Sequence, residues 1–589
     1  MVALGNIARM TVIYKKSWIF ILISQIFVLA SSTVMILIPL QVQNLINKGV
    51  LQGVAGEEQV INAVIMILLL AFLYAIFISL NIMMAVAFSE GTADYIRRKT
   101  FEKVQTYSFK NFDQHSTGEL MIRLNNDIYQ INLAVQLAMR FLLAAPFTII
   151  VAVVAVLLFS PDLAWIFLIA IPLMGLVLLL VARRLQRQYK ERQKRLDTMN
   201  NRLQENFSGV RVVKAFMRQE HERKSYDKVN DEYRLSAQAP MKTQYWILPS
   251  MFAIIGISTA LAVWVGGNAA FSDPAKVGAL VAFTQYLLMI LAQMFNLSIL
   301  LPQLSSADIS AGRIFDLLRV QPDIKDPPMP HSVDLAHFKG RVVFEEVAFR
   351  YGGKEGSETV KNISLVAEPG ETVAFLGATG CGKSTLINLI PRFYDVTSGK
   401  ITIDGVDVRE IPQEVLRQIV VPVLQESVLF SGEVRENIKM GRPDATDDEM
   451  EVAAKAADAH KFLTAMPEGY DRTVARRGTN FSGGQRQRLC IARGICALPK
   501  VLIMDDSTSA VDVATESRIQ EEMKRVLANT TTFIVAQRIS TVLLANKIVL
   551  LENGEIKAIG NHETLMRESQ LYQEIFNSQL GGLRQEDVA

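Results

Sequence analysis

The stretch 372-TVAFLGATGCGKSTLINLI-390 carries the strongest structural signal in the sequence. Its beginning, TVAFLG, is an apolar run typical of a buried strand, and its end, TLINLI, is predicted to be a helix. Between them lies a glycine-rich loop of the form GxxxxGKS. Glycines let the backbone N–H groups of such a loop turn inward around phosphate groups, and the helix N-terminus adds its positive dipole end. The order of strand, loop and helix therefore predicts a phosphate-binding site in an α/β domain.

The side chains of this loop have distinct expected roles. Lys383 is expected to contact the β- and γ-phosphates of ATP, and Ser384 is expected to hold Mg²⁺. Cys381 occupies a variable position of the loop and is interpreted as a small filler rather than a redox sensor. The predicted ATP-binding residues of this stretch are Gly377, Thr379, Gly380, Cys381, Gly382, Lys383, Ser384 and Thr385.

The N-terminal half of the chain has a different character from this domain. Half of the 589 residues are hydrophobic and only 20% are charged, and the long apolar runs all lie before residue 311. Six of them approach or exceed the roughly 20 apolar residues that a membrane-crossing helix needs. They lie near 17–40, 60–88, 136–159, 163–182, 246–271 and 277–301. The first run continues to Leu40, which is longer than the apolar core of a usual signal peptide.

These runs predict the domain organisation. We expect an α-helical transmembrane domain of six helices over 1–311, a linker over 312–337, an α/β nucleotide-binding domain over 338–578 and a C-terminal tail over 579–589. The loops between the runs near 89–135 and 183–245 are rich in Lys and Arg. The positive-inside rule places both of these loops, and both termini, in the cytoplasm. They contain apolar residues at helical spacing, so the membrane helices are expected to continue into them.

Charge and cysteine content exclude other classes of protein. A formal net charge of +3 is too small to imply nucleic-acid binding. The three cysteines have no metal-ligand spacing and suggest no disulfide framework, which fits a reducing cytoplasm. Several polar residues inside the apolar runs could line a substrate path or form hydrogen bonds between helices, and the second interpretation is favoured. These residues are Asn81, Arg140, Gln285, Gln293 and Asn296.

A second motif discriminates among the many proteins that have such a phosphate-binding loop, including kinases, GTPases and motors. The sequence FSGGQ (481–485) is followed by the apolar run VLIM (501–504) and by Asp505 and Asp506. Together with the glycine-rich loop, these residues resemble the ATP-binding cassette (ABC) family. Six membrane helices before one cassette is the layout of an ABC exporter half-transporter, so the resemblance covers nearly the whole chain.

The resemblance assigns roles to further residues. Tyr351 matches an aromatic residue that stacks on adenine, and Gln425 matches a loop glutamine that contacts Mg²⁺ and the attacking water. With Asp505, the expected Mg²⁺ ligands are Ser384, Gln425 and Asp505. In the family, two cassettes dimerise head to tail, and the signature residues contact the γ-phosphate of the ATP bound to the other chain. They correspond here to Ser482, Gly483, Gly484 and Gln485.

Other segments match the parts that join two chains or two domains. Residues 509–512 match a loop that crosses the dimer interface. Residues 117–127 and 206–220 resemble the two cytoplasmic loops of exporters, whose short helices dock into the cassettes and transmit their closure.

Two residues depart from the family pattern. The pattern calls for a glutamate after Asp505, where this chain has Asp506, whose side chain is one methylene shorter. Withdrawing a base by about 1 Å can cost about a hundredfold in rate. The pattern also calls for a histidine where this chain has Gln537, which cannot become a cation. Asp506, Gln537 and Gln425 are thus the expected catalytic set of a site that binds ATP and hydrolyses it poorly.

This combination resembles one subunit of the heterodimeric multidrug ABC exporters of bacteria. It implies a transport ATPase of the bacterial cytoplasmic membrane that uses ATP and Mg²⁺ and exports amphiphilic small molecules. The expected partner is a second, non-identical half-transporter that supplies the missing glutamate and histidine. Three alternatives stay open: a lipid or peptide exporter, a nucleotide-sensing subunit that transports nothing, and a homodimer that hydrolyses ATP slowly through Asp506.

Overall fold

The computed structural model describes residues 18–274, 276–327, 338–352 and 356–580, and the chain divides into two units. Unit 1 comprises Met1–Thr106 and His115–Val320, and unit 2 comprises Tyr107–Gln114 and Gln321–Ala589. The start of the first predicted membrane run, most of the second half of the predicted linker and nearly all of the predicted C-terminal tail lie outside the described residues.

Unit 1 is helical, and most of its helices are long. Their bounds are α2 (Trp18–Asn44), α3 (Glu57–Gln105), α5 (Thr117–Ile122), α6 (Ile128–Phe141), α7 (Ala144–Phe159), α8 (Ala164–Ser208), α9 (Val210–Ala215), α10 (Gln219–Tyr245), α11 (Ile247–Ser272) and α12 (Lys276–Arg319). At 49 residues, α3 is far longer than a bilayer requires, and α8 has 45 residues. The expected continuation of membrane helices beyond their apolar runs is therefore confirmed for these two helices.

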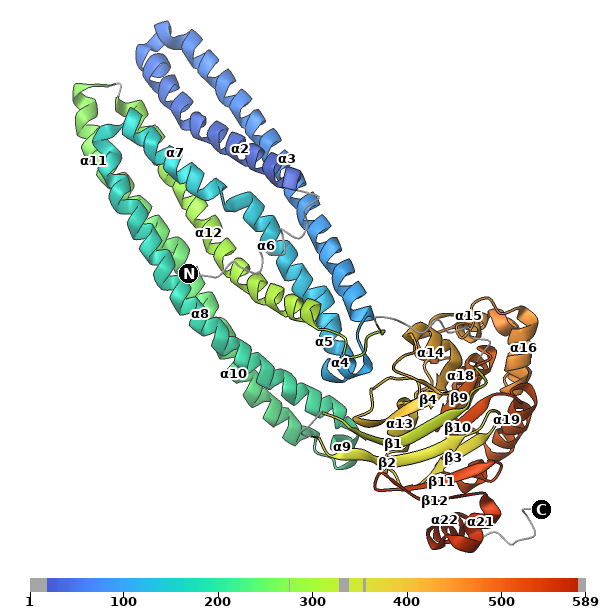
Figure 1. The fold of residues 1–589 in the computed structure, drawn as a ribbon. Coiled ribbons are helices and arrows are strands. Elements are labelled where there is room, and N and C mark those ends of the chain that lie inside the picture. The colour runs from blue at the N-terminus through green and yellow to red at the C-terminus, as the bar shows by residue number, and fades with distance from the viewer. Residues whose placement is uncertain (1–17, 275, 328–337, 353–355, 581–589) are drawn as a thin grey trace. The chain divides into compact units, whose positions relative to one another are not determined.

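Five continuous helical stretches among the described residues are long and apolar enough to cross a membrane. This number differs from the six predicted crossings because the first stretch, Trp18–Gln105, contains two of the predicted runs. Within it, α2 and α3 lie side by side, joined by a short π-helix (Leu45–Gly49) and a 3₁₀-helix (Val50–Gly56) (Figure 1).

Large apolar side chains cover the outside of these helices. Leu68, Phe72, Leu158 and Leu168 are each between 65% and 70% exposed. A contiguous apolar surface of this kind is unfavourable in water and is the surface that lipid covers in a membrane protein. The exposed faces of unit 1 therefore agree with the apolar runs read from the sequence.

Buried Asn81 and Asp127 make polar contacts between helices of unit 1. Asn81 on α3 is fully buried, and its Nδ2 donates to the Ser24 carbonyl at 3.0 Å and to Ser24 Oγ on α2 at 2.8 Å. Asn81 thus forms the hydrogen bond between helices that was the favoured interpretation. Asp127, at the end of the π-helix Arg123–Asp127, is 1% exposed. Its Oδ1 accepts from Ser310 Oγ at 2.9 Å, and its Oδ2 accepts from Arg313 Nε at 2.8 Å, both on α12.

Unit 2 is an α/β domain with a six-stranded sheet of order β12-β11-β3-β10-β9-β6 and a four-stranded antiparallel sheet of order β2-β1-β4-β5 (Figure 1). The strands are β1 (Val342–Arg350), β2 (Glu358–Ala367), β3 (Thr372–Leu376), β4 (Ser398–Ile403), β5 (Val406–Asp407), β6 (Val420–Val423), β9 (Val501–Asp505), β10 (Thr531–Val535), β11 (Lys547–Glu552) and β12 (Glu555–Gly560); a small pair joins β7 (Gly432–Glu433) and β8 (Thr473–Val474). Neighbouring strands from β6 to β11 in the larger sheet are parallel.

Unit 2 also contains helices. They are α4 (Phe109–Gln114), α13 (Lys383–Asn388), α14 (Gln413–Ile419), α15 (Val434–Lys439), α16 (Asp447–Ala456), α17 (His460–Thr464), α18 (Gly483–Cys496), α19 (Val513–Val526), α20 (Ile539–Val542), α21 (His562–Glu568) and α22 (Gln570–Leu580). Val373 and Phe375 of β3 belong to one buried cluster, whereas Ala374 and Leu376 belong to another. Successive side chains of a strand point to opposite faces, so β3 is apolar from Val373 to Leu376 because both of its faces are buried.

Candidate nucleotide site

The site forms where three parallel strands end. The glycine-rich loop follows β3, Asp505 ends β9, and Gln537 lies two residues beyond β10. Carboxyl ends of parallel strands share one edge of the sheet, which is where open α/β sheets bind their ligands. A cavity of about 280 Å³ opens there. It is lined by Thr359, Thr379, Gly380, Gly382, Lys383, Ser384, Thr385, Gln425, Asp505, Asp506, Val535 and Gln537.

The glycines of the loop are required by its geometry. Gly377, Gly380 and Gly382 have φ angles of 154°, 84° and 101°, a region that favours glycine. A Cβ atom on Gly382 would lie 2.7 Å from the Thr359 carbonyl oxygen, and one on Gly377 would lie 2.2 Å from the Leu551 carbonyl oxygen. Side chains are therefore excluded at these two positions, and the positive φ angles give the loop the tight turns of a phosphate-binding loop.

Polar side chains at this loop fit a phosphate-bound magnesium ion. Lys383 Nζ donates to the carbonyl oxygens of Gly377 at 2.7 Å and Ala378 at 2.9 Å, and these two hydrogen bonds hold the lysine ammonium group against the loop. Ser384 Oγ donates to Asp505 Oδ1 at 2.9 Å. Burial raises the pKa of Asp505, while Ser384 and Lys383 act in the opposite direction. A hydroxyl beside a carboxylate offers the oxygen ligands that Mg²⁺ takes.

The two residues that depart from the ABC pattern contact each other. Gln537 Nε2 donates to Asp506 Oδ2 at 3.0 Å, and Gln425 Nε2 lies 3.5 Å from the same oxygen. Burial, followed by repulsion from Asp505, raises the pKa of Asp506. The predicted catalytic set therefore meets at one carboxylate oxygen.

The predicted signature residues lie elsewhere, as expected for groups that act on another chain. Ser482 precedes α18, and its Oγ accepts from the Gln485 backbone N–H at 3.3 Å, while Gln485 Oε1 accepts from the Ser482 N–H at 2.9 Å. This reciprocal pair caps the helix and fixes both side chains. Gly483 and Gly484 form the first turn of α18. None of the four lines the cavity of this chain.

Comparison with known proteins decides the family. Residues 21–294 match the family model described as "ABC transporter transmembrane region", and residues 360–509 match the one described as "ABC transporter". The chain is 35% identical over 560 residues to "Uncharacterized ABC transporter ATP-binding protein YfiB" of Bacillus subtilis, covering 95% of this chain and 96% of that protein. This chain belongs to the ABC transporter family.

Further relatives and one solved structure are similar to this ABC transporter. It is 36% identical over 488 residues to "Putative multidrug export ATP-binding/permease protein YgaD" of Bacillus subtilis, covering 82% of this chain and 83% of that one. A structure described as a bacterial Atm1-family ABC exporter with ATP bound has a TM-score of 0.77, with 24% identity over 94% of this chain and 97% of that chain. At this identity the likeness establishes the fold alone.

The segment of this ABC transporter that joins the cassette unit is Tyr107–Gln114, just before the predicted loop 117–127. Phe109 of α4 stacks on Phe393 with ring centroids 4.0 Å apart. Tyr394 Oη donates to Asp113 Oδ2 at 2.8 Å. Burial, followed by this hydrogen bond, raises the pKa of Tyr394, so its hydroxyl stays a donor. The sequence interpretation missed these contacts, because residues 113 and 394 are 281 positions apart.

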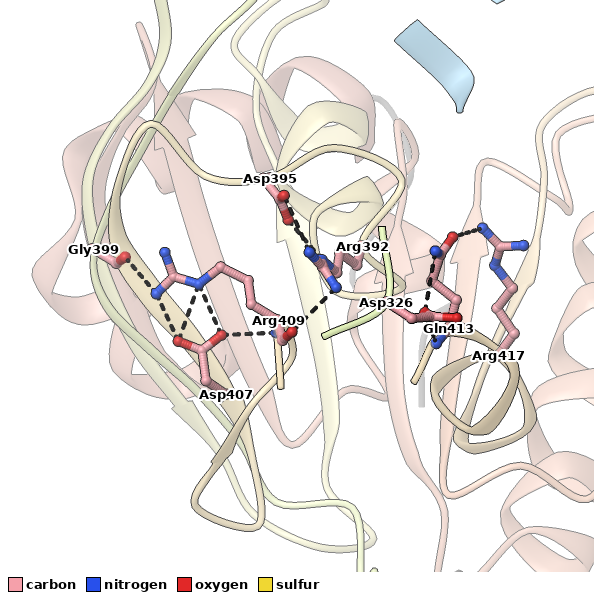
Figure 2. A network of polar contacts seen from close by, with 8 residues as sticks. All are labelled: Asp326, Arg392, Asp395, Gly399, Asp407, Arg409, Gln413 and Arg417. Atoms are coloured by element: carbon pink, nitrogen blue, oxygen red, sulfur yellow. Dashed lines mark hydrogen bonds and ion pairs between the residues drawn. The ribbon is translucent and has the colours of Figure 1, made fainter. Parts of the chain in front are cut away.

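A buried arginine fixes the turn that presents Phe393 and Tyr394. Arg392 is 6% exposed and has a φ angle of 54°. Its Nε donates to Asp395 Oδ1 at 2.7 Å and its Nη1 to the Arg409 carbonyl at 3.2 Å, as Figure 2 shows. Asp407 in turn accepts from Arg409 Nε at 3.0 Å. This network fixes the backbone on either side of the two aromatic residues.

One of these aromatic residues, Tyr394, contacts the predicted adenine-binding residue Tyr351. The Tyr351 ring lies edge-on to Tyr394, with centroids 5.4 Å apart, and its Oη donates to Thr385 Oγ1 at 3.3 Å. Tyr394 therefore lies between the nucleotide site and α4. Thr359 and Val535 also line the cavity and were not predicted. No motif marks them, because Thr359 approaches the loop through its backbone.

We expect Tyr394→Phe to reduce transport by the assembled transporter several-fold while ATP affinity stays within about twofold. The change removes a hydrogen bond to a carboxylate, worth about 1.5–3 kcal/mol, and leaves the ring beside Tyr351. Substrate uptake into vesicles and ATP titration on one preparation measure the two effects. Tyr470→Phe is the matched control, because its hydroxyl contacts His460 Nδ1 at 2.9 Å elsewhere in the cassette. Equal transport in the two variants would contradict a role for Tyr394 in coupling.

Proposed function

We propose that this chain is one half of a heterodimeric exporter that moves amphiphilic small molecules across the bacterial cytoplasmic membrane at the expense of ATP. Its ABC transporter membership, the exporter fold and relatives named for multidrug export support this proposal. In this proposal the chain crosses the membrane six times with both termini in the cytoplasm.

The observation that carries the proposal is the contact between Gln537 and Asp506 at 3.0 Å. A glutamine amide cannot take up a proton, so it offers no cation to the γ-phosphate. The carboxylate is one methylene shorter than the glutamate of the ABC pattern, and its Oδ2 already accepts the Gln537 amide. This site therefore binds ATP and hydrolyses it poorly, while the signature 482–485 completes the competent site of the partner.

The remaining residues bind and orient the nucleotide. Bound Mg²⁺ neutralises charge on the phosphate groups. Lys383 would hold the β- and γ-phosphates, Ser384, Asp505 and Gln425 would hold the metal ion, and Tyr351 would stack on adenine. ATP bound between two cassettes favours the closed dimer over the open one, and this difference in affinity drives the change of access. Hydrolysis at the partner's site then returns the membrane helices to the inward-facing state.

ATPase activity of the purified chain, alone and in complex with its partner half-transporter, tests this proposal. We expect the chain alone to turn over ATP at less than about a tenth of the rate of the complex, a loss of at least 1.4 kcal/mol in transition-state stabilisation. In the complex, Asp506→Asn should leave the rate within about twofold, whereas Ser482→Ala should lower it about tenfold by removing a donor to the partner's nucleotide.

The opposite pattern would refute the asymmetric arrangement. If the chain alone hydrolyses ATP at the rate of the complex and Asp506→Asn abolishes that activity, the transporter is a homodimer. ATP-dependent uptake of cationic dyes into vesicles that contain the complex tests the substrate class. Uptake or flipping of lipid without dye uptake would assign a lipid exporter instead.

A further inference from the structure

The helix α22 (Gln570–Leu580) contacts the loop that carries Gln537. Gln579 Nε2 donates to the Gln537 carbonyl oxygen at 3.0 Å. On the same loop, the backbone N–H of Ile539 donates to Gln579 Oε1 at 2.8 Å. One side-chain amide therefore satisfies a backbone acceptor and a backbone donor two residues apart. Such a pair fixes the loop more firmly than a single hydrogen bond, because it restrains both position and orientation.

The position of α22 is itself set by packing. Tyr572 is fully buried and belongs to the same hydrophobic cluster as Ile539 and Val542 of α20. Its hydroxyl lies 2.8 Å from His562 Nδ1, so the two side chains share a hydrogen bond. The ring of Phe576 packs against His562 with centroids 5.3 Å apart. Gln579, one turn beyond Phe576, is thus held beside the loop by buried contacts of its own helix.

The other side of the loop faces the nucleotide site. The Gln537 side chain donates to Asp506 Oδ2 at 3.0 Å. Arg538 Nη2 donates to the Ser509 carbonyl at 3.1 Å, and its Nη1 donates to the Val511 carbonyl at 3.3 Å. The three-residue loop 537–539 therefore lies between the C-terminal helix and the segment that follows Asp506.

We propose that Gln579 is a positioning residue for the loop 537–539, and that α22 thereby controls the affinity of this site for ATP. The amide of Gln579 holds the backbone of Gln537 where its side chain meets Asp506. A displacement of α22 then shifts Gln537, whose side chain lies at the γ-phosphate end of the cavity. This inference rests on the proposed function only in that residue 537 belongs to an ATP site, and it does not depend on whether that site hydrolyses ATP.

The test uses the full chain with Gln579→Ala, and Asn577→Ala, an exposed change on the same helix, as its control. The Ile539 amide should exchange its hydrogen about tenfold faster in Gln579→Ala, because its acceptor is removed. Binding of ATP with Mg²⁺, measured by calorimetry, should weaken about fivefold. In a Gln537→Ala background, Gln579→Ala should weaken binding no further, since coupled residues are not additive.

Three outcomes overturn the proposal. If Gln579→Ala matches Asn577→Ala both in hydrogen exchange at Ile539 and in ATP affinity, the Gln579 amide does not position the loop. Faster exchange without weaker binding would show that the loop position does not affect the site. An equal loss of affinity in the Gln537→Ala background would show that α22 acts only through general stability. Gln579→Glu, which retains an acceptor for Ile539, should protect that amide and still weaken binding, because its carboxylate faces the Gln537 carbonyl.

Discussion

The double variant Asp506→Glu/Gln537→His should raise the ATP turnover of the purified chain, without a partner, about a hundredfold. Glutamate extends the carboxylate by one methylene toward the attacking water, and histidine can carry a positive charge near the γ-phosphate. In the unaltered chain, the Gln537 amide instead donates to Asp506 Oδ2 at 3.0 Å. Release of inorganic phosphate from ATP with Mg²⁺ measures the turnover.

The single variants are the controls for this gain. Asp506→Glu alone lacks the cation, and Gln537→His alone leaves the shorter carboxylate, so each should give less than about a tenth of the gain of the pair. Asp506 has a φ angle of 47°, which aspartate tolerates better than glutamate. Thermal unfolding should therefore show a small loss of stability in the variants that carry glutamate. An unaltered chain that is as fast as the double variant would show that the site is not impaired.

Replacing Lys383 by alanine should weaken ATP binding about a hundredfold, or about 2.7 kcal/mol. The ammonium group is the one cationic side chain among the described residues that line the cavity, and ionised donors form the stronger hydrogen bonds to phosphate. Calorimetric titration with a non-hydrolysable ATP analogue measures the loss without turnover.

Lys400→Ala provides the matched control for this prediction. Lys400 is paired with Glu345 at 3.1 Å on the other sheet and does not line the cavity. Its removal should leave ATP affinity unchanged. If both lysine variants lose affinity equally, the effect is one of net charge or folding, and the role assigned to Lys383 is wrong.

Local motifs predicted most of the residues that line the cavity of the candidate site, although Tyr351 and Gly377 are not among its lining residues. The run TVAFL forms β3, and the loop residues from Thr379 to Thr385, apart from Cys381, line the cavity together with Gln425, Asp505, Asp506 and Gln537. This works because strand, loop and helix are consecutive in the chain, so the geometry follows from glycine positions and apolar patterning.

Contacts between distant segments could not be read in the same way. Gln579 lies on the last described helix, and nothing in its local sequence distinguishes it from other glutamines. Its role depends on the packing of Tyr572, which places α22 beside residues 537–539. Likewise, the apolar runs predicted which parts of the helices cross a membrane but not where the helices end. The helix α3, for example, continues to Gln105 through charged residues after its apolar part.

The buried Asp127 bears on how mechanical force travels through the membrane helices. Its carboxylate binds Ser310 and Arg313 on the last turns of α12, and losing Arg313 would leave the buried charge of Asp127 without its counter-ion. We therefore expect the start of α6 and the end of α12 to move together. A displacement of α12 at its end, Arg319, should therefore be transmitted to α6. When the helix bundle opens, relative motion should occur at other helix–helix contacts.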